Sequence, residues 1–137
     1  MKQVIENGEI VLMVVATAGT IVYGAIDLIG QISKLCKKYN VWLHVDGSWG
    51  GSLILSKDQK HKLRGIYLVD SVTWNPHKMI QVPLQCSVLI TSHSGIFERC
   101  NSYHASYLFQ KDKFYDSSYD TGDKYIQCGR KVDILKL

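Results

Sequence analysis

The sequence predicts an α/β fold built on a mostly parallel sheet. A continuous apolar run from Ile10 to Ala16 and a second one from Val41 to Asp46 flank a segment of helical periodicity. A strand that is covered on both faces carries such an uninterrupted hydrophobic run, which is typical of parallel sheets. Strand, helix and strand in succession indicate a right-handed crossover, so we expect the two strands to be parallel neighbours.

The segment between these strands predicts the crossover helix. Apolar residues recur at helical spacing between Ala25 and Tyr39, namely Ile26, Ile29, Ile32, Leu35 and Cys36. Asp27 lies near the start, lysines lie near the end, and Asn40 suits the position that closes the helix. We therefore expect a helix over 25–39 that ends at Asn40.

The later elements are predicted with less regular patterns. The polar segment Ser56 to Leu63 indicates a short surface helix, and Asp70 to Trp74 indicates a third strand. A fourth strand, Cys86 to Ile90, follows a turn that contains Pro83. The polar, tyrosine-rich stretch from Asn101 to Lys124 predicts mostly loop, and long loops in compact domains are often functional.

Composition indicates one soluble globular domain over residues 1–137 and no second domain. The chain is 46% hydrophobic and 20% charged, and its longest apolar run is too short to span a membrane. The N-terminus shows no signal peptide, so we expect a cytoplasmic protein without membrane association. The net charge of +4 is spread along the chain, which argues against a nucleic-acid partner.

The cysteines predict neither a metal site nor a disulfide framework. They have no C-x-x-C spacing and no neighbouring histidine pair, and they are Cys36, Cys86, Cys100 and Cys128. We expect free thiols in a reducing compartment, with Cys128 as a buried structural thiol.

A carboxylate and an amine follow two of the predicted strands. Asp46 closes one strand, and Lys78 lies just past another in S-V-T-W-N-P-H-K-M, Ser71 to Met79. Ligands collect at the carboxyl ends of strands in open parallel sheets, so both groups should border one crevice. Pyridoxal 5'-phosphate uses such a pair, a lysine for its aldehyde and an acid for its pyridine nitrogen. Taken singly, Asp46 also fits an ordinary turn residue, Lys78 a solvated surface residue and His77 a structural histidine.

Five motifs together resemble one family. They are H-V-D-G-S-W-G-G, His44 to Gly51; S-V-T-W-N-P-H-K-M; P-L-Q-C-S; H-A-S-Y-L-F-Q, His104 to Gln110; and Y-D-T-G-D-K, Tyr119 to Lys124. In order and across nearly the whole chain, they resemble the group II pyridoxal-phosphate-dependent decarboxylases. The resemblance is closest to the animal glutamate decarboxylases, and cysteine sulfinate decarboxylase is also similar. It implies the central part of the large domain of a fold-type I transferase, in truncated form.

The resemblance implies the catalytic residues. Lys78 would form the Schiff base with the cofactor, and Asp46 would pair with the pyridine nitrogen. Tyr107, in the stretch that matches the family's mobile loop, would protonate the α-carbon after carbon dioxide leaves, a role that suits a phenol brought in by a closing loop. Without the family match, the simpler interpretation of Tyr107 is an aromatic side chain that packs beneath a loop and anchors it.

Further cofactor contacts are implied by position. Asn75 and His77 would neighbour the cofactor phosphate, and Thr20 would lie at the edge of the pocket. Ser48 stands where the family usually has an alanine that packs on the cofactor ring, which puts a polar oxygen near the ring face. Gln81 replaces a family glycine close behind the lysine.

The function implied is α-decarboxylation of a small acidic amino acid, with glutamate converted to 4-aminobutyrate. A homodimer, or pairing with a full-length relative, is expected because loops complete the neighbouring site in the related enzymes. The alternative is a truncated, catalytically inactive decarboxylase-like protein that acts only as an interaction partner. The family's upstream phosphate loop and its downstream substrate-gripping arginine have no match here, and a sheet with one crossover helix would leave apolar surface uncovered.

Overall fold

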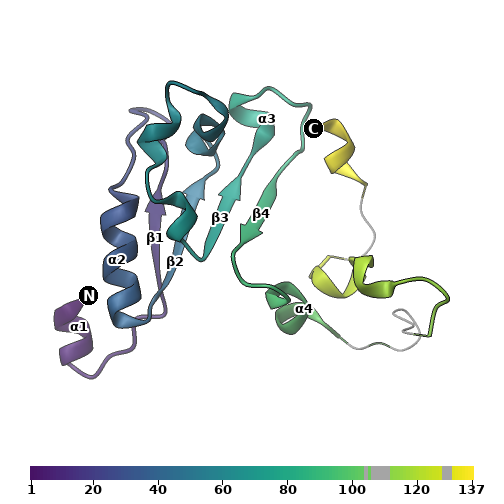
Figure 1. Cartoon of the computed structure of the whole chain (residues 1–137), viewed down its shortest axis with the longest axis horizontal. Coiled ribbons are helices and arrows are strands. Elements are labelled where there is room, and N and C mark those ends of the chain that lie inside the picture. Colours follow the sequence, from purple (N-terminus) through teal and green to yellow (C-terminus); the bar gives the residue numbers. More distant parts are fainter. Residues whose placement is uncertain (104, 106–111, 128–130) are drawn as a thin grey trace. The chain divides into compact units, whose positions relative to one another are not determined.

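The computed structural model describes residues 1–103, 105, 112–127 and 131–137, and the chain divides into two compact units. The first unit comprises Met1–Ser92 together with Asp133–Leu137, and the second comprises His93–Val132. The first unit contains the sheet, and Figure 1 labels its strands and helices. The residues of the predicted site that the structure describes all belong to this first unit.

The first unit is built on a four-stranded sheet in the order β1-β2-β3-β4. The strands are Met13–Thr17, Trp42–Gly47, Ser71–Trp74 and Val88–Thr91. β1 and β2 are parallel, β2 and β3 are parallel, and β4 runs antiparallel to β3. The predicted α/β fold with a mostly parallel sheet is confirmed, and the arrows of β1, β2 and β3 end at one edge of the sheet (Figure 1).

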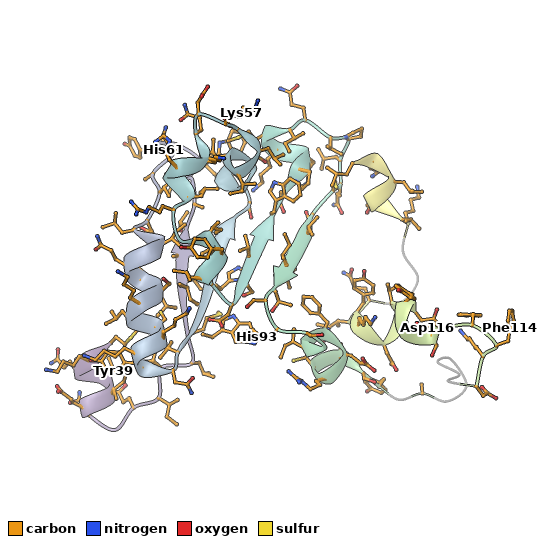
Figure 2. The ribbon with its side chains drawn as sticks, viewed as in Figure 1. Tyr39, Lys57, His61, His93, Phe114 and Asp116 are labelled. Atoms are coloured by element: carbon orange, nitrogen blue, oxygen red, sulfur yellow. The ribbon has the colours of Figure 1, made fainter. Side chains whose placement is uncertain are left out.

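Four α-helices lie in the described residues: α1 (Lys2–Glu6), α2 (Ile29–Tyr39), α3 (Pro76–Met79) and α4 (Ile96–Asn101). The predicted surface helix over 56–63 is instead a 3₁₀ turn at Lys60–Leu63, although its side chains Lys57 and His61 are exposed as expected (Figure 2). Other 3₁₀ turns are Gly50–Leu55, Ile66–Leu68, Ser117–Tyr119, Gly122–Lys124 and Asp133–Lys136. The helices of four to six residues were not predicted, because so short a segment shows no periodicity.

Helix α2 begins later than its apolar pattern indicates. Ile26 forms a β-bridge with Ala18, and the Asp27 carboxylate accepts a hydrogen bond of 2.7 Å from the backbone N–H of Thr17. The backbone N–H of Asp27 donates in turn to the Thr17 carbonyl at 2.9 Å. Asp27 therefore does not cap the helix. Its two hydrogen bonds to Thr17 hold the loop against the end of β1.

The predicted C-terminal end of α2 is confirmed. Asn40 adopts a left-handed conformation with φ of 53°, and its N–H lies against the carbonyls of Cys36 and Lys37. The N–H of Val41 also donates to the Cys36 carbonyl at 2.9 Å. Asparagine tolerates this conformation better than most residues, so it ends the helix and turns the chain into β2.

The core lies between α2 and one face of the sheet. Ile29 and Cys36 of the helix are 1% exposed, as is Leu43 of β2. The other buried apolar members of this cluster are Ala16, Ala18, Val41, Val45, Leu63 and Val69. Because the side chains of a strand alternate, this packing covers only one of the two faces of the sheet.

The opposite face of the sheet is partly uncovered in the described residues. Met13 and Val15 of β1 are 50% and 55% exposed, and Leu89 of β4 is also half-exposed. The prediction that the first strand begins at Ile10 is wrong: Ile10 and Leu12 lie outside β1 and are highly exposed. An apolar run alone does not make a strand where no neighbouring strand pairs with it.

Candidate functional site

A cavity of about 470 Å³ opens at the carboxyl ends of the parallel strands. The loop after β1 contributes Thr20, the end of β2 contributes Asp46 and Ser48, and the helix after β3 contributes Lys78. Tyr23 and Trp49 add aromatic surface to the wall. This size falls within the range of small-molecule sites, and the position matches the rule for ligands in open α/β sheets.

Asp46 carries the negative charge of this cavity. Its carboxylate accepts a hydrogen bond of 3.0 Å from the backbone N–H of Ser48. Hydrogen bonds from the side chain and then the backbone of Ser48 hold the pKa of Asp46 below its usual value, and the positive charge of Lys78 and the nearby His44 lower it further. Partial burial opposes these effects without overcoming them. Asp46 is therefore ionised at neutral pH, as a group that pairs with a protonated ring nitrogen must be.

Lys78 owes its position to the short helix α3. Asn75 is extended, with φ of −118°, and Pro76 occupies the first helical position, where its missing N–H costs nothing. The backbone N–H of Lys78 donates to the Asn75 carbonyl at 3.0 Å, which closes the turn. The half-buried Lys78 side chain lines the cavity that also contains Asp46.

The loop after β1 and the loop after β2 contact each other at Gly19 and Gly50. The N–H of Gly50 donates to the Ala18 carbonyl at 2.9 Å, and a Cβ at Gly50 would lie 2.4 Å from the same oxygen. Gly19 lies on the other side of this contact with φ of +90°, a conformation that favours glycine. The approach is possible only without side chains, and it holds Ser48 and Trp49 beside the loop that carries Thr20.

Thr20 closes its own loop. The backbone N–H of Ala25 donates to Thr20 Oγ1 at 3.0 Å, and the N–H of Thr20 donates to the Ala25 carbonyl at 3.0 Å. The Thr20 hydroxyl thus accepts from the backbone and keeps its own O–H as a donor at the cavity wall. Next to it, Ile21 is 82% exposed.

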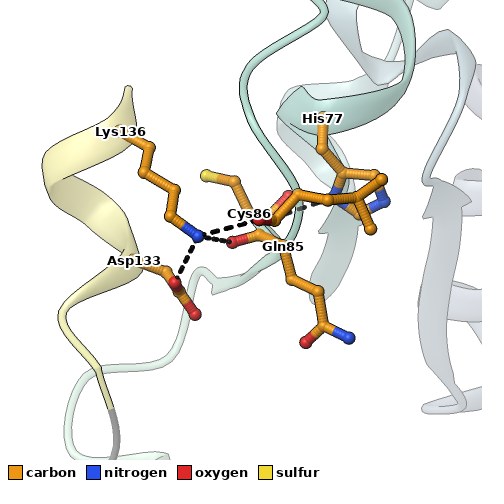
Figure 3. Close-up of polar contacts among 6 residues, drawn as sticks. His77, Gln85, Cys86, Asp133 and Lys136 are labelled. Carbon is orange, nitrogen blue, oxygen red and sulfur yellow. Dashed lines mark hydrogen bonds and ion pairs between the residues drawn. The ribbon is translucent and has the colours of Figure 1, made fainter.

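Asn75 and His77 do not line this cavity. The Asn75 amide oxygen is buried and has no hydrogen-bond partner in the part of the chain that the structure describes. His77 Nδ1 lies 2.6 Å from the carbonyl oxygen of Cys86 and 3.2 Å from its backbone nitrogen (Figure 3). The side chain of His77 is therefore held by the turn that leads into β4.

A polar network on the face that carries Asp46 was missed in the sequence. Trp42 Nε1–H donates to Ser71 Oγ at 2.9 Å, and that oxygen lies 2.8 Å from His44 Nδ1. His44 Nε2 lies 3.1 Å from Thr73 Oγ1. Since Ser71 accepts from the indole, its own O–H can donate to Nδ1, which leaves Nε2–H to donate to Thr73. The alternation of β2 places Trp42, His44 and Asp46 on one face, and this was the available signal.

Two of the residues singled out in the sequence fall on the undescribed stretches. Tyr107 and Cys128 lie outside the described residues. Of the other cysteines, Cys36 and Cys86 are buried and Cys100 is exposed, all as free thiols. Burial and then the charge of Asp70 raise the pKa of the Cys36 thiol.

Within the described residues, no three metal-binding side chains converge, and no helix is long and apolar enough to cross a bilayer.

Residues 1–137 match the model of a protein family described as the pyridoxal-dependent decarboxylase conserved domain. The chain belongs to the pyridoxal-dependent decarboxylase family. The predicted resemblance to pyridoxal-phosphate decarboxylases is thereby confirmed.

Solved structures of decarboxylases share this fold. Mouse CSAD is 46% identical with a TM-score of 0.90, and the match covers 98% of this chain and 28% of that one. TDC of Oryza sativa, solved with PLP and tryptamine, is 28% identical with a TM-score of 0.89, over 99% of this chain and 28% of that one. The glutamate decarboxylase domain of diaminobutyrate-pyruvate transaminase and L-2,4-diaminobutyrate decarboxylase from Vibrio parahaemolyticus is 37% identical with a TM-score of 0.63, and the match covers 66% of this chain and 19% of that one. The chain thus spans little more than a quarter of the length of CSAD.

The described residues fit the cofactor that this family uses. An amine and an ionised carboxylate line one cavity at the strand ends, which are the two groups that an aldehyde and a basic ring nitrogen require. The buried Asn75 amide oxygen has no partner among the described residues, and a flip of the end group would place an N–H donor at this position, where it could bind an anion such as a phosphate. Thr20 and Ser48 line the same cavity, from the two loops that meet at Gly50.

Proposed function

We propose that this chain forms the cofactor-binding centre of a pyridoxal-phosphate-dependent amino-acid α-decarboxylase. The observation that carries the proposal is the convergence of Asp46 and Lys78, from the ends of neighbouring parallel strands, on one cavity. Membership of the decarboxylase family supports the same chemistry.

Each residue has a distinct task in this proposal. When bound, pyridoxal phosphate supplies an aldehyde for covalent attachment and an electron-withdrawing ring. Lys78 provides the amine that holds the cofactor, and the Asp46 carboxylate keeps the ring nitrogen protonated. Thr20 donates its hydroxyl at the edge of the site, and Ser48 lies against the ring. Tyr107 donates the proton that the α-carbon takes up after carbon dioxide leaves.

The proposed substrate is a small acidic amino acid, with glutamate first. The motifs that resemble the animal glutamate decarboxylases support this choice. The Oryza TDC structure with tryptamine makes an aromatic amino acid the competing substrate. Of the described residues that line the cavity, only Lys78 is cationic, and the proposal assigns it to the cofactor, so these residues supply no second cation for the substrate's side-chain carboxylate.

The proposed partner is a second copy of the chain or a full-length relative, in the cytoplasm. A second candidate function, that of an inactive interaction partner, is favoured by the half-exposed apolar side chains Met13, Val15 and Leu89 on the sheet face opposite α2. Such a face is normally covered in parallel sheets. Co-elution with a full-length relative in gel filtration, without activity, would support this second function.

Release of carbon dioxide separates the candidates. The purified chain, alone and mixed with a full-length relative, is supplied with pyridoxal phosphate and with glutamate, cysteine sulfinate or tryptophan. The proposal predicts release from glutamate that is lost with Lys78→Ala and retained with Lys57→Ala, an exposed lysine outside the cavity. Release from tryptophan alone would contradict the acidic substrate, and no release from any amino acid would favour the inactive partner.

A further inference from the structure

The C-terminal turn of the first unit is anchored by one lysine. Lys136 Nζ lies 2.7 Å from Asp133 Oδ1, and it donates hydrogen bonds of 3.0 Å to the Leu84 carbonyl and 3.2 Å to the Gln85 carbonyl (Figure 3). A lysine ammonium has three N–H donors. All three are used here, so the group binds the turn at 84–86 as a cation with a complete set of acceptors.

The same turn holds His77 from its other side. The residue after Gln85 is Cys86, which is 2% exposed, and both of its backbone polar groups lie against His77 Nδ1. The turn is thus bound by Lys136 through two carbonyls and by His77 through the next peptide groups (Figure 3). His77 directly precedes Lys78 in the helix α3.

The two contacts of His77 require different tautomers. The 2.6 Å contact needs a proton on Nδ1 that is donated to the Cys86 carbonyl, whereas the 3.2 Å contact needs an unprotonated Nδ1 that accepts from the Cys86 N–H. The shorter distance, which is in the range of strong hydrogen bonds, favours Nδ1–H. This tautomer leaves Nε2 as the ring nitrogen that is free to interact elsewhere.

We propose that Lys136 is a positioning residue for the cofactor-binding centre, because it fixes the turn at 84–86 whose Cys86 carbonyl sets the orientation and tautomer of His77 beside Lys78. No motif of the sequence pointed to Lys136, which lies far from Lys78 along the chain. The role of His77 as a neighbour of the cofactor phosphate rests on the proposed function, whereas the effect of Lys136 on His77 does not.

The imidazole nitrogens of His77 report this effect directly. The ¹⁵N shifts of the ring, assigned with His77→Gln, are measured in the cofactor-free chain at a pH where the ring is neutral. Wild type is expected to show the Nδ1–H form. Lys136→Met should shift His77 toward a mixture of tautomers because the turn is released, whereas Lys136→Arg should restore much of the wild-type signal. Lys57→Met, which removes an exposed lysine elsewhere (Figure 2), should leave it unchanged.

Cofactor affinity gives the second measurement. Titration with pyridoxal phosphate, followed by absorbance, should show about tenfold weaker binding for Lys136→Met, the equivalent of one lost charge-assisted hydrogen bond. Asp133→Asn keeps both hydrogen bonds to the turn and should give a smaller change in both measurements. If Lys136→Met does not fold, Lys136→Gln, which removes the ammonium charge and shortens the side chain, takes its place and should also shift the His77 signals.

The outcomes distinguish this inference from the proposed function. Unchanged His77 signals in a folded Lys136→Met chain, or in Lys136→Gln if the first variant is unfolded, would overturn the role of Lys136. Failure of wild type to bind pyridoxal phosphate at Lys78 would overturn the proposed function instead, and the tautomer measurement would still test the link from Lys136 to His77.

Discussion

The Ser48 side chain lowers the pKa of Asp46. Ser48 occupies a position where the decarboxylases that the sequence resembles usually have an alanine. Its hydrogen bonds are the largest cause of the lowered pKa of Asp46. The ionised carboxylate contributes stability above the pKa it has in the unfolded chain, and this contribution is lost as pH falls through its lower folded value. Ser48 thus widens the acidic range in which Asp46 stays ionised.

Ser48→Ala should raise the pKa of Asp46 toward its ordinary value. The side-chain hydrogen bond is lost while the backbone one remains, so part of the lowering should persist. The carboxyl ¹³C shift of Asp46 as a function of pH measures the change. Ser52→Ala serves as a control, because Ser52 accepts from Trp74 and is not among the causes of the Asp46 shift. Identical titrations of wild type and Ser48→Ala would contradict this role.

At this scale the sequence predicted that Asp46 and Lys78 border one crevice, and the structure places both at one cavity, because strand ends meet at one edge of a parallel sheet. Their roles toward the cofactor stay predictions. The sequence could not predict the surroundings of His77, since these depend on a turn and a C-terminal segment distant in the chain. The sequence also could not show why the family has a glycine at the position of Gln81, because the reason lies in the backbone conformation. Gln81 adopts a left-handed φ of 62°, which explains why a glycine suits that position.

At the scale of elements, the site depends on the contact between two loops. The loop after β1 and the turn after β2 approach at Gly50, where a Cβ has no room beside the Ala18 carbonyl. The sequence showed a cluster of small residues after β2 without showing what they contact. The crossover helix was predicted by its periodicity and its Asn40 end, but its start was not, because Asp27 binds β1 instead.

Gly50→Ala should lower the free energy of unfolding by about 3 kcal/mol, since the backbone must move to admit the methyl group. It should also weaken cofactor binding, because Ser48 and Trp49 move with the turn. Urea unfolding and the absorbance titration measure the two effects. Gly51→Ala is the matched control: its Cβ would meet only the Trp74 side chain at 3.1 Å, and a side chain can yield. Equal effects of the two substitutions would contradict the importance of the loop contact.

At the scale of the whole molecule, the described residues cover only one of the two faces of the sheet. One face of the sheet packs on α2, and the other exposes Met13 and Val15. The alternation and the apolar runs predicted the strands, yet the run from Ile10 extends beyond β1 because pairing, not composition, decides where a strand begins. In the CSAD and TDC structures, the segment that matches this chain is 28% of a longer polypeptide.

Borohydride reduction of the purified chain with added pyridoxal phosphate, followed by mass mapping of the modified lysine, tests the central claim most directly. The account predicts one dominant modification, at Lys78, that is lost with Lys78→Ala and reduced with Asp46→Ala, because the carboxylate then no longer holds the ring nitrogen. Modification scattered over exposed lysines such as Lys57 and Lys62, without preference for Lys78, would contradict it.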